Sequence, residues 1–464
     1  MHHVDGILDL EPMRMQARGG ITRVGSGPDR LPLSTPPRAA RLDRVRSHTL
    51  DTTARSRTLD TTAPRDDRIP RSPSPGAPPR QAWSARRAAC ATLALAALVA
   101  CPARAATLAR GPYLQNLATD RVVVVWRTDT PATCTLALRE VRGGAERIVA
   151  GARGTDCAVD ARGLTAGTRY AYVPRADGVA LTGESVFETD DPTAPFSFLV
   201  LGDSGCGCPT QLAVRDHMLA SPADFILHTG DMVYRNGEAA DFDPKFFTPY
   251  GDLIRRLVFW PCLGNHDVRT ASGQPWRDAF YTPANNPVGS EDHYSFDFGN
   301  AHLVVLDSNA STEPGSPQHT FLDQDLAASA APWKFVAFHH ALYSSGYHGG
   351  ARKIRRSLVP LLDRHHVDLV FMGHEHHYER TWPLRGDVIV PAGEGTVYVT
   401  TGGGGHSIRP VGTSPFTAYA ESAFHFTRVH VDGTTLRLEM VRSDGLIRDT
   451  MILHKPAPPR RKDP

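Results

Sequence analysis

The chain has 464 residues, of which 41% are hydrophobic and 22% charged, and these ordinary globular proportions exclude a wholly disordered, collagenous or multi-spanning membrane protein. The length favours two or three domains. The net charge of +2 is unevenly distributed: residues 1–105 carry 17 Arg, no Lys and nine acidic residues (+8), and residues 106–464 carry a net charge of −6. A nucleic acid is therefore not an expected partner of the acidic region 106–464.

Residues 1–82 are rich in Arg, Pro, Ser and Thr without an apolar period, which predicts a disordered basic segment. Residues 83–105 follow the order of a signal peptide, with two arginines, a short apolar run and a small-residue cleavage site near Ala105. The pattern predicts a secreted or periplasmic protein whose start codon was assigned too early. Two alternatives stay open: a signal anchor with a basic cytoplasmic tail, and a lipoprotein with its lipid on Cys101.

Export permits disulfides, so the seven cysteines are informative. Cys134 and Cys157 lie in the first folded segment and could bridge two of its strands. Cys206 and Cys208 flank one glycine in a loop, where a pair of thiols or a structural bridge is favoured over a metal site. Cys262 lies in an apolar, strand-like run. The sequence leaves the pairing of these five residues open.

An all-β domain is predicted for residues 107–190. Its β-rich runs include residues 121–126 and 132–139, separated by turns with Gly, Asp and Pro. A later Gly-Leu-Thr-Ala-Gly-Thr-Arg-Tyr stretch resembles the turn into a late strand of a fibronectin type III sandwich, which would place Trp126 and Tyr170 in the core. The domain has no cluster of titratable residues, so we expect it to serve packing and domain positioning.

Over residues 195–457 apolar runs alternate with helical stretches, which predicts an α/β (α+β) sandwich of four layers, with mixed β-sheets flanked by helices. The expected strands span residues 196–201, 225–227, 258–263, 302–306, 335–338, 369–372 and 397–400. The expected helices span residues 209–220, 321–330 and 350–366, and His365 and His366 at the last helix end should face solvent. A polar tail, residues 458–464, follows. Sites in such folds form at the carboxyl ends of strands.

Five of the expected strands end in side chains that can bind a metal. The candidate ligands are Asp203, Asp231, Tyr234, Asn265, His339, His374 and His376. Each strand end is weak evidence for a metal site when taken alone, since Gly-Asp after a strand is more often part of a turn. Together they offer two carboxylates, a phenol, an amide and three imidazoles, which are hard to borderline donors. Seven donors exceed the capacity of one ion, so we expect two metal ions that share a bridging carboxylate.

Strand geometry chooses among the histidines. Residues two apart on a strand share a face, so His374 and His376 should converge while His377 points away. The same argument separates His339 from His340. We therefore expect His340 and His377 to be structural or to support the ligands.

With these blocks in this order, the chain resembles the purple acid phosphatase branch of the calcineurin-like metallophosphoesterases over roughly residues 107–455. The Gly-Asp-x-x-Tyr block ending at Tyr234 is specific to that branch, and Gly205 stands where the wider superfamily often has His. The resemblance implies a first metal on Asp203, Tyr234 and His376, a second on Asn265, His339 and His374, and Asp231 bridging them. It also implies a β-sandwich before the catalytic domain.

The implied activity is hydrolysis of phosphate monoesters, of the acid phosphatase type. A phenol loses its proton near pH 10, so a tyrosinate at Tyr234 predicts ferric iron there, whereas the second site would accept zinc, manganese or ferrous iron. Metal-bound hydroxide would attack phosphorus in line, with His266 as general acid and donor to the phosphate oxygens. His348 resembles a family position that faces the substrate. Asp267 replaces a glutamate of plant members and is expected to orient His266.

Two rival functions stay open. A phosphodiesterase could use the same dinuclear centre on a nucleotide or phospholipid diester. An exported adhesion or binding protein with a vestigial site is less favoured, because all seven donor positions are filled. The expected partners are small phosphate esters, with no transmembrane span in the mature chain. The natural ester, the pH optimum and the oligomeric state are not predicted.

Overall fold

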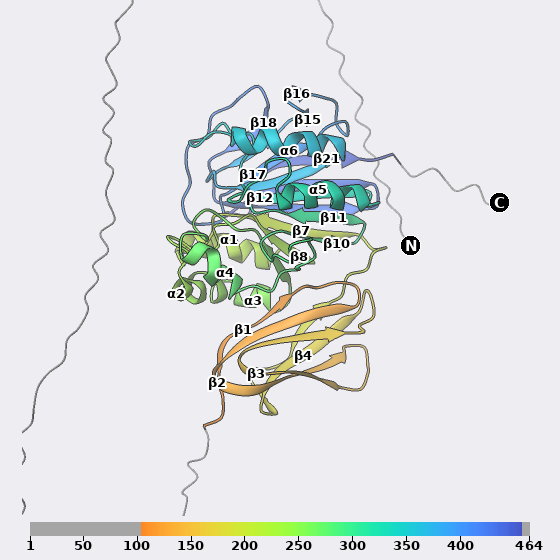
Figure 1. Ribbon diagram of the computed structural model, residues 1–464, viewed down its shortest axis with the longest axis vertical. Coiled ribbons are helices and arrows are strands. Elements are labelled where there is room, and N and C mark those ends of the chain that lie inside the picture. Colours follow the sequence, from red (N-terminus) through yellow and green to blue (C-terminus); the bar gives the residue numbers. More distant parts are fainter. Residues whose placement is uncertain (1–103, 457–464) are drawn as a thin grey trace, which may run out of the picture. The chain divides into compact units, whose positions relative to one another are not determined.

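The structure is a computed structural model that describes residues 104–456 (Figure 1). The basic segment 1–82, the signal-like stretch as far as residue 103 including Cys101, and the polar tail 458–464 lie outside the described residues. Within the described range, no helix combines the length and the apolar composition that crossing a membrane requires.

The first folded segment is all-β, as predicted. Its strands form one six-stranded, hydrogen-bonded sheet and are β1 (Leu108–Gln115), β2 (Arg121–Glu140), β3 (Arg147–Arg162), β4 (Arg169–Ala176), β5 (Val179–Ala180) and β6 (Ser185–Glu188). The two runs expected within residues 121–139 are one strand, β2, whose pairing with β3 shifts register after Arg127 and again after Thr133. Trp126 and Tyr170 are buried in the core, and a Cys134–Cys157 disulfide joins β2 to β3.

The rest of the chain is built on two large mixed sheets and a small hairpin. One sheet has the order β10-β11-β12-β13-β17-β14-β18, the other has the order β21-β20-β19-β7-β8-β9, and β15 pairs with β16. The strands are β7 (Phe196–Leu201), β8 (Phe225–His228), β9 (Val258–Pro261), β10 (Tyr294–Phe298), β11 (Ala301–Val305), β12 (Trp333–His340), β13 (Leu369–Gly373), β14 (Tyr378–Thr381), β15 (Leu384–Arg385), β16 (Val388–Ile389), β17 (Val397–Thr401), β18 (Thr417–Glu421), β19 (His425–Asp432), β20 (Thr435–Arg442) and β21 (Ile447–His454).

Helices cover the outer faces of these sheets (Figure 1). They are α1 (Pro209–Leu219), α2 (Ala239–Phe242), α3 (Gly251–Ile254), α4 (Gln274–Arg277), α5 (Pro317–Ala328) and α6 (Arg352–Arg364), with a π-helical turn at Asp243–Phe247 and a 3₁₀ turn at Ala271–Gly273. Apolar residues of α1 pack with the outer face of β7 and β8, and those of α5 and α6 pack with β11, β12 and β13. The result is the predicted order of helix, sheet, sheet and helix.

Strand β7 shows why the two sheets stack. Its sequence, Phe-Ser-Phe-Leu-Val-Leu, is apolar on both faces, which is typical of a strand covered on both sides. Phe198 faces the other sheet, where its ring centroid lies 5.7 Å from that of Phe335 and 5.9 Å from that of Phe371. Leu199 and Leu201 face the helical side with α1. The free cysteine, Cys262, is buried in the core between the sheets.

Each large sheet contains a parallel set of strands. In one sheet β7, β8 and β9 run parallel, and in the other β11, β12, β13 and β17 run parallel. All seven predicted strands of this region and the three predicted helices are present within a few residues of their expected limits. The carboxyl ends of the parallel strands are where the candidate ligands lie.

Candidate metal centre

The structure brings all seven predicted donors to the carboxyl ends of five strands. They lie in or directly after β7 (Asp203), β8 (Asp231 and Tyr234), β9 (Asn265), β12 (His339) and β13 (His374 and His376). Three of these strands belong to one large sheet and two to the other. The site therefore lies where the ends of the two sheets meet.

The first group of donors contains the phenol. Asp203, Asp231 and His376 each offer a ligating atom, and these atoms lie within 4.8 Å of one another. The hydroxyl of Tyr234 lies 3.0 Å from Oδ1 of Asp203 and 3.2 Å from Nε2 of His376. All four side chains are buried. This is the set that the resemblance implied for a first metal, with Asp231 included.

The second group surrounds the amide oxygen of Asn265. This Oδ1 lies 3.0 Å from Nε2 of His339 and 2.9 Å from Nδ1 of His374. Nε2 of His339 is also 3.6 Å from Oδ2 of Asp231. Asp231 thus touches both groups, which is the position that a bridging ligand requires.

Backbone strain concentrates at these residues. Asp203, Asp231 and His374 have φ of 58°, 56° and 70°, in the left-handed region that residues with a Cβ seldom occupy. Two glycines allow the backbone to pass close to the candidate carboxylate ligands. A Cβ at Gly264 would lie 2.2 Å from Oδ1 of Asp231, and one at Gly373 would lie 2.5 Å from Oδ2 of Asp203. Strain of this kind is typical of a site that a surrounding fold holds in place.

The pKa shifts of Asp203, Tyr234 and His374 bear on whether these side chains can bind a cation. Burial acts to raise the pKa of Asp203, but the hydrogen bond and charge of His376 outweigh it and hold that pKa below its usual value. Burial, together with the charges of Asp203 and Asp231, raises the pKa of the Tyr234 phenol well above 10. Burial and the neighbouring His339 lower the pKa of His374 to about 2, so its imidazole is neutral and available as a ligand. Two buried carboxylates, neutral imidazoles, an amide and a phenol fit two hard or borderline cations.

His266 lies beside this centre, but Asp267 does not orient it. Nδ1 of His266 donates to the carbonyl oxygen of Arg235 at 2.6 Å, and Nη2 of Arg269 lies 3.3 Å from Nε2. The Asp267 carboxylate instead accepts backbone N–H groups of Met232 and Gly264, both at 2.9 Å. The expectation that Asp267 orients His266 is wrong, because the two adjacent side chains point to opposite sides of the turn.

His348 also lies at the centre. Its ring stacks on that of His374, with centroids 4.4 Å apart. His348 therefore lies next to a candidate ligand, and its role toward a substrate stays a prediction.

The four histidines that we did not expect to bind metal, His340, His365, His366 and His377, lie in different surroundings. His340 hydrogen-bonds Ser308 at 2.8 Å through Nδ1, and His377 is fully buried. His365 is not solvent-facing, because it is mostly buried and pairs with Asp323 at 2.6 Å, whereas His366 is exposed as expected.

His374 and His376 do not lie on a strand, so the expected alternation of strand faces does not explain their orientation. Strand β13 ends at Gly373, and the following residues are a bend in which His374 has positive φ. The two imidazoles face the site because of this bend, and they serve different donor groups. The residues that converge are those expected, but the physical reason is a turn.

Several residues near the centre were missed. His406 stacks on Tyr234 with ring centroids 3.7 Å apart, and Ser407 hydrogen-bonds Nδ1 of His376 at 2.6 Å. Arg409 donates its backbone N–H to the carbonyl of His376 at 2.9 Å. These residues follow the glycine run 402–405, a turn with close backbone approaches, and that run was the available sequence signal.

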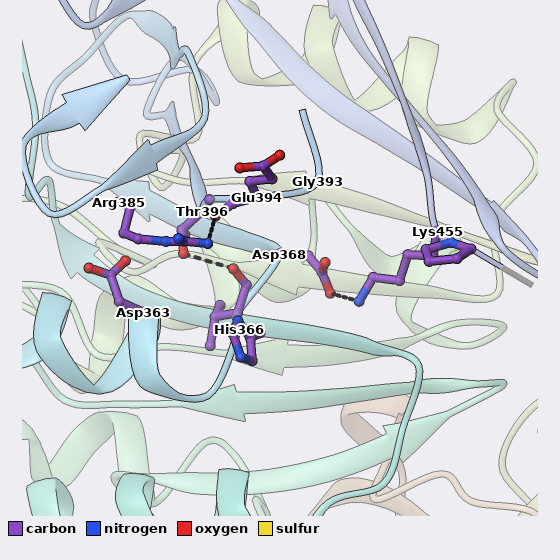
Figure 2. A pocket seen from close by; sticks show the side chains of 11 residues that line it. Asp363, His366, Asp368, Arg385, Gly393, Glu394, Thr396 and Lys455 are labelled. Carbon is purple, nitrogen blue, oxygen red and sulfur yellow. Dashed lines mark hydrogen bonds and ion pairs between the residues drawn. The ribbon is translucent and has the colours of Figure 1, made fainter. Parts of the chain in front are cut away.

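A polar cavity of about 210 Å³ lies at the opposite end of β13 (Figure 2). Val367 and Asp368, which precede this strand, line it together with Arg385, Glu394 and Lys455. Lys455 donates to Asp368 at 2.7 Å. None of the seven donors lines this cavity, so it is separate from the centre.

Comparisons with known proteins agree with this fold. Residues 196–378 match the family described as "Calcineurin-like phosphoesterase", and residues 395–450 match "Iron/zinc purple acid phosphatase-like protein C". The chain thus contains a region similar to the calcineurin-like phosphoesterases, followed by a region similar to the C-terminal part of purple acid phosphatase-like proteins.

Two of the similar proteins are named purple acid phosphatases, and a third is named for activity on nucleotides. The chain is 30% identical to "Purple acid phosphatase 21" of Arabidopsis thaliana over 58% of this chain and 63% of that protein. It is 28% identical to a "Nucleotide pyrophosphatase/phosphodiesterase" of Hordeum vulgare over 50% of this chain and 72% of that protein. A purple acid phosphatase from yellow lupin seeds, PPD1, has the same fold, with a TM-score of 0.66 and 20% identity over 75% of this chain and 74% of that one. Some matching relatives are named "probable inactive".

Proposed function

We propose that the chain is an exported dinuclear-metal phosphatase that hydrolyses phosphate monoesters. The observation that carries this proposal is the meeting of seven side chains from five strand ends in two donor groups that share Asp231. Two bound cations would polarise the phosphoryl oxygens and generate the attacking nucleophile from water. The similarity to purple acid phosphatases supports the same conclusion.

The chain's own residues supply protons and orientation. Nδ1 of His266 donates to the Arg235 carbonyl, and in the protonated ring Nε2 would donate to the leaving-group oxygen or a phosphate oxygen in place of its 3.3 Å contact with Nη2 of Arg269. His348 stacks on His374 at the same centre and is proposed to face the substrate. No protein nucleophile is required by this arrangement.

The metal assignment rests on the phenol. Because burial and two carboxylates oppose its ionisation, Tyr234 would become tyrosinate only beside a strongly charged, hard cation. We therefore propose ferric iron with Asp203, Tyr234 and His376. Zinc, manganese or ferrous iron would suit Asn265, His339 and His374.

Hydrolysis of two model esters tests the proposal. Purified protein loaded with iron and zinc should cleave p-nitrophenyl phosphate much faster than bis(p-nitrophenyl) phosphate, and Asp231→Ala should abolish both activities. The reverse preference would favour the second candidate, a phosphodiesterase, which the name of the barley relative supports. Wild-type protein that holds no metal and cleaves neither ester would support the vestigial site of a binding protein.

Export is supported by the two disulfides, Cys134–Cys157 and Cys206–Cys208, since such bonds persist in oxidising compartments. Cleavage near Ala105 and, as an alternative, lipidation at Cys101 are parts of the same proposal. So are the division into an all-β domain at 107–190 and a catalytic domain at 195–457, and the fibronectin type III-like character of the first. Mass spectrometry of the exported chain's N-terminus tests the cleavage site.

A further inference from the structure

Arg409 is an arginine beside the metal centre whose guanidinium, among the described residues, has no carboxylate partner. Its backbone is fixed by the hydrogen bond to His376, and its guanidinium Nη1 lies 3.0 Å from both ring nitrogens of His348. Within residues 104–456 no carboxylate lies within 4.0 Å of this guanidinium, although most half-buried arginines of the chain have such a partner. A guanidinium is always charged, so the side chain carries an uncompensated positive charge beside the site.

A buried carboxylate, Glu375, holds the backbone of His348, the imidazole that Arg409 contacts. Glu375 is fully buried, and its Oε1 accepts the backbone N–H of His348 at 2.7 Å. Its other oxygen, Oε2, has no hydrogen-bond partner in the described chain and lies 3.6 Å from Nδ1 of His348. This carboxylate oxygen therefore lies next to the imidazole that contacts Arg409.

A second buried carboxylate holds the same segment. Glu379 accepts the backbone N–H of Ser345 at 2.7 Å and its hydroxyl at 2.6 Å. Between the two attachment points, a Cβ at Gly346 would lie 2.2 Å from the ring of His377. The segment from Ser345 to His348 is thus packed against buried groups, which fixes His348 before any ligand arrives, and the Arg409 guanidinium contacts this imidazole.

We propose that Arg409 and His348 form a second anion-binding subsite beside the metal centre, so that preferred substrates carry an anionic group, such as a second phosphate, in addition to the phosphate that is cleaved. This inference rests on the proposed function and names its substrate class. Arginine is suited to the role because its planar fork binds phosphate oxygens through two parallel hydrogen bonds. The ring of Tyr347, 78% exposed, lies 5.4 Å from the guanidinium carbon and supports its outer face.

The arginines on the other side of the centre are less suited to this role. Arg235 and Arg269 are both exposed. Arg269 is held by the carbonyl of Arg235 at 3.3 Å and by His266. Both side chains are more exposed than that of Arg409, so binding an anion there would require more ordering of the arginine.

Binding of two phosphonates, which are not hydrolysed, tests the subsite without relying on turnover. Calorimetry on the metal-loaded protein should show 1,3-propanebisphosphonate binding about tenfold or more tightly than propylphosphonate, the gain expected of one charge-assisted pair. Arg409→Gln should remove most of that difference and leave propylphosphonate binding within about twofold to threefold. Arg356→Gln, an exposed arginine on α6, is the matched control and should change neither value. Equal binding of the two ligands by the wild type, or an unchanged preference in Arg409→Gln, would overturn the proposal.

A kinetic comparison separates this inference from the proposed function. The kcat/KM for 1,3-propanediol bisphosphate relative to that for 3-hydroxypropyl phosphate should fall in Arg409→Gln, chiefly through KM, and should be partly restored in Arg409→Lys. If neither ester is cleaved but the bisphosphonate preference persists and depends on Arg409, the phosphatase proposal fails and the subsite stands. If both esters are cleaved at equal kcat/KM by wild type and Arg409→Gln alike, the subsite fails and the phosphatase proposal stands.

Discussion

His266 and Asp267 are adjacent in the chain, yet they do different work. The imidazole points to the surface of the metal centre, and the carboxylate points into the protein, where it accepts three backbone N–H groups. The two residues should therefore respond differently to replacement. One change should affect catalysis and the other stability.

For His266, the prediction concerns turnover. His266→Ala keeps every metal ligand and removes the proton donor together with a ring contact to Tyr234, whose ring centroid lies 4.6 Å away, so kcat should fall about 10²-fold to 10⁴-fold. Metal content by mass spectrometry and the melting temperature should stay close to the wild type. A parallel loss of bound metal and activity would show that the imidazole is structural.

For Asp267, the prediction concerns folding and metal affinity. Asp267→Ala leaves the buried N–H groups of Met232, Val233 and Gly264 without a partner, which should cost of the order of 3 kcal/mol. Because these groups belong to the turns that carry Asp231 and Asn265, metal affinity should fall as well. Asp267→Asn keeps one carbonyl acceptor and should lose less in urea unfolding. Equal stability of all three proteins would contradict this account.

At the level of elements, the two disulfides close loops of very different length. Cys134–Cys157 joins β2 to β3 across a sequence separation of 23, and Cys206–Cys208 spans a separation of 2. Chain entropy predicts about 3 kcal/mol for the longer loop and about 1.5 kcal/mol for the shorter one. Cys134→Ala/Cys157→Ala should therefore unfold at lower urea than Cys206→Ala/Cys208→Ala, with mild reduction of the wild type as a control. The opposite order would show that the loop at 206–208 has a larger structural role.

A buried histidine with two carboxylate partners joins three other elements. His302 on β11 lies 2.7 Å from Asp297 on β10 and 2.8 Å from Asp325 on α5. Burial acts to lower its pKa, but the two carboxylates outweigh burial and raise the pKa to about 9. Since the folded pKa exceeds the unfolded value of 6.5, this stabilisation is complete below pH 6.5 and is lost as pH rises through 9.

The pH dependence of one substitution tests the contribution of His302. His302→Gln should lower the free energy of unfolding by about 1 to 2 kcal/mol at pH 6, a figure reduced because Asp297 is 77% exposed, and by much less at pH 10. The measurement is the difference between wild-type and variant unfolding curves at each pH. A difference that is constant from pH 6 to pH 10 would mean that the contribution is packing alone.

The predictability of the elements follows from their environment. Strands such as β7 and β13 are apolar on both faces and end in Gly-Asp or Gly-His, so their position and their chemistry are visible in one short run. Strands β18 and β21 have many partly exposed residues and pair only antiparallel, so neither has the continuous apolar run that predicts a buried strand. The missed site residues, His406 and Arg409, reach the centre on a loop whose path depends on distant contacts.

At the level of the whole described chain, the all-β segment is attached to the α/β part through specific contacts. Gln115 donates to the carbonyl of Phe259 at 2.9 Å and accepts the N–H of Tyr281 at 2.9 Å. Tyr172 donates its hydroxyl to the carbonyl of Arg255 at 2.8 Å. These buried or half-buried contacts fix β1 and β4 against the segments that flank β9. The first segment thus contributes support to one side of the sheet that carries Asn265.

The central claim is that side chains from both large sheets hold two cations through a shared Asp231. Element analysis of the purified protein, read together with its visible spectrum, tests this claim most directly. We expect two metal ions per chain, one of them iron with a visible absorption band that Tyr234→Phe removes, and loss of both ions in Asp231→Ala. A wild-type protein that is fully active with one ion per chain or none, or an Asp231→Ala variant that keeps both ions, would contradict it.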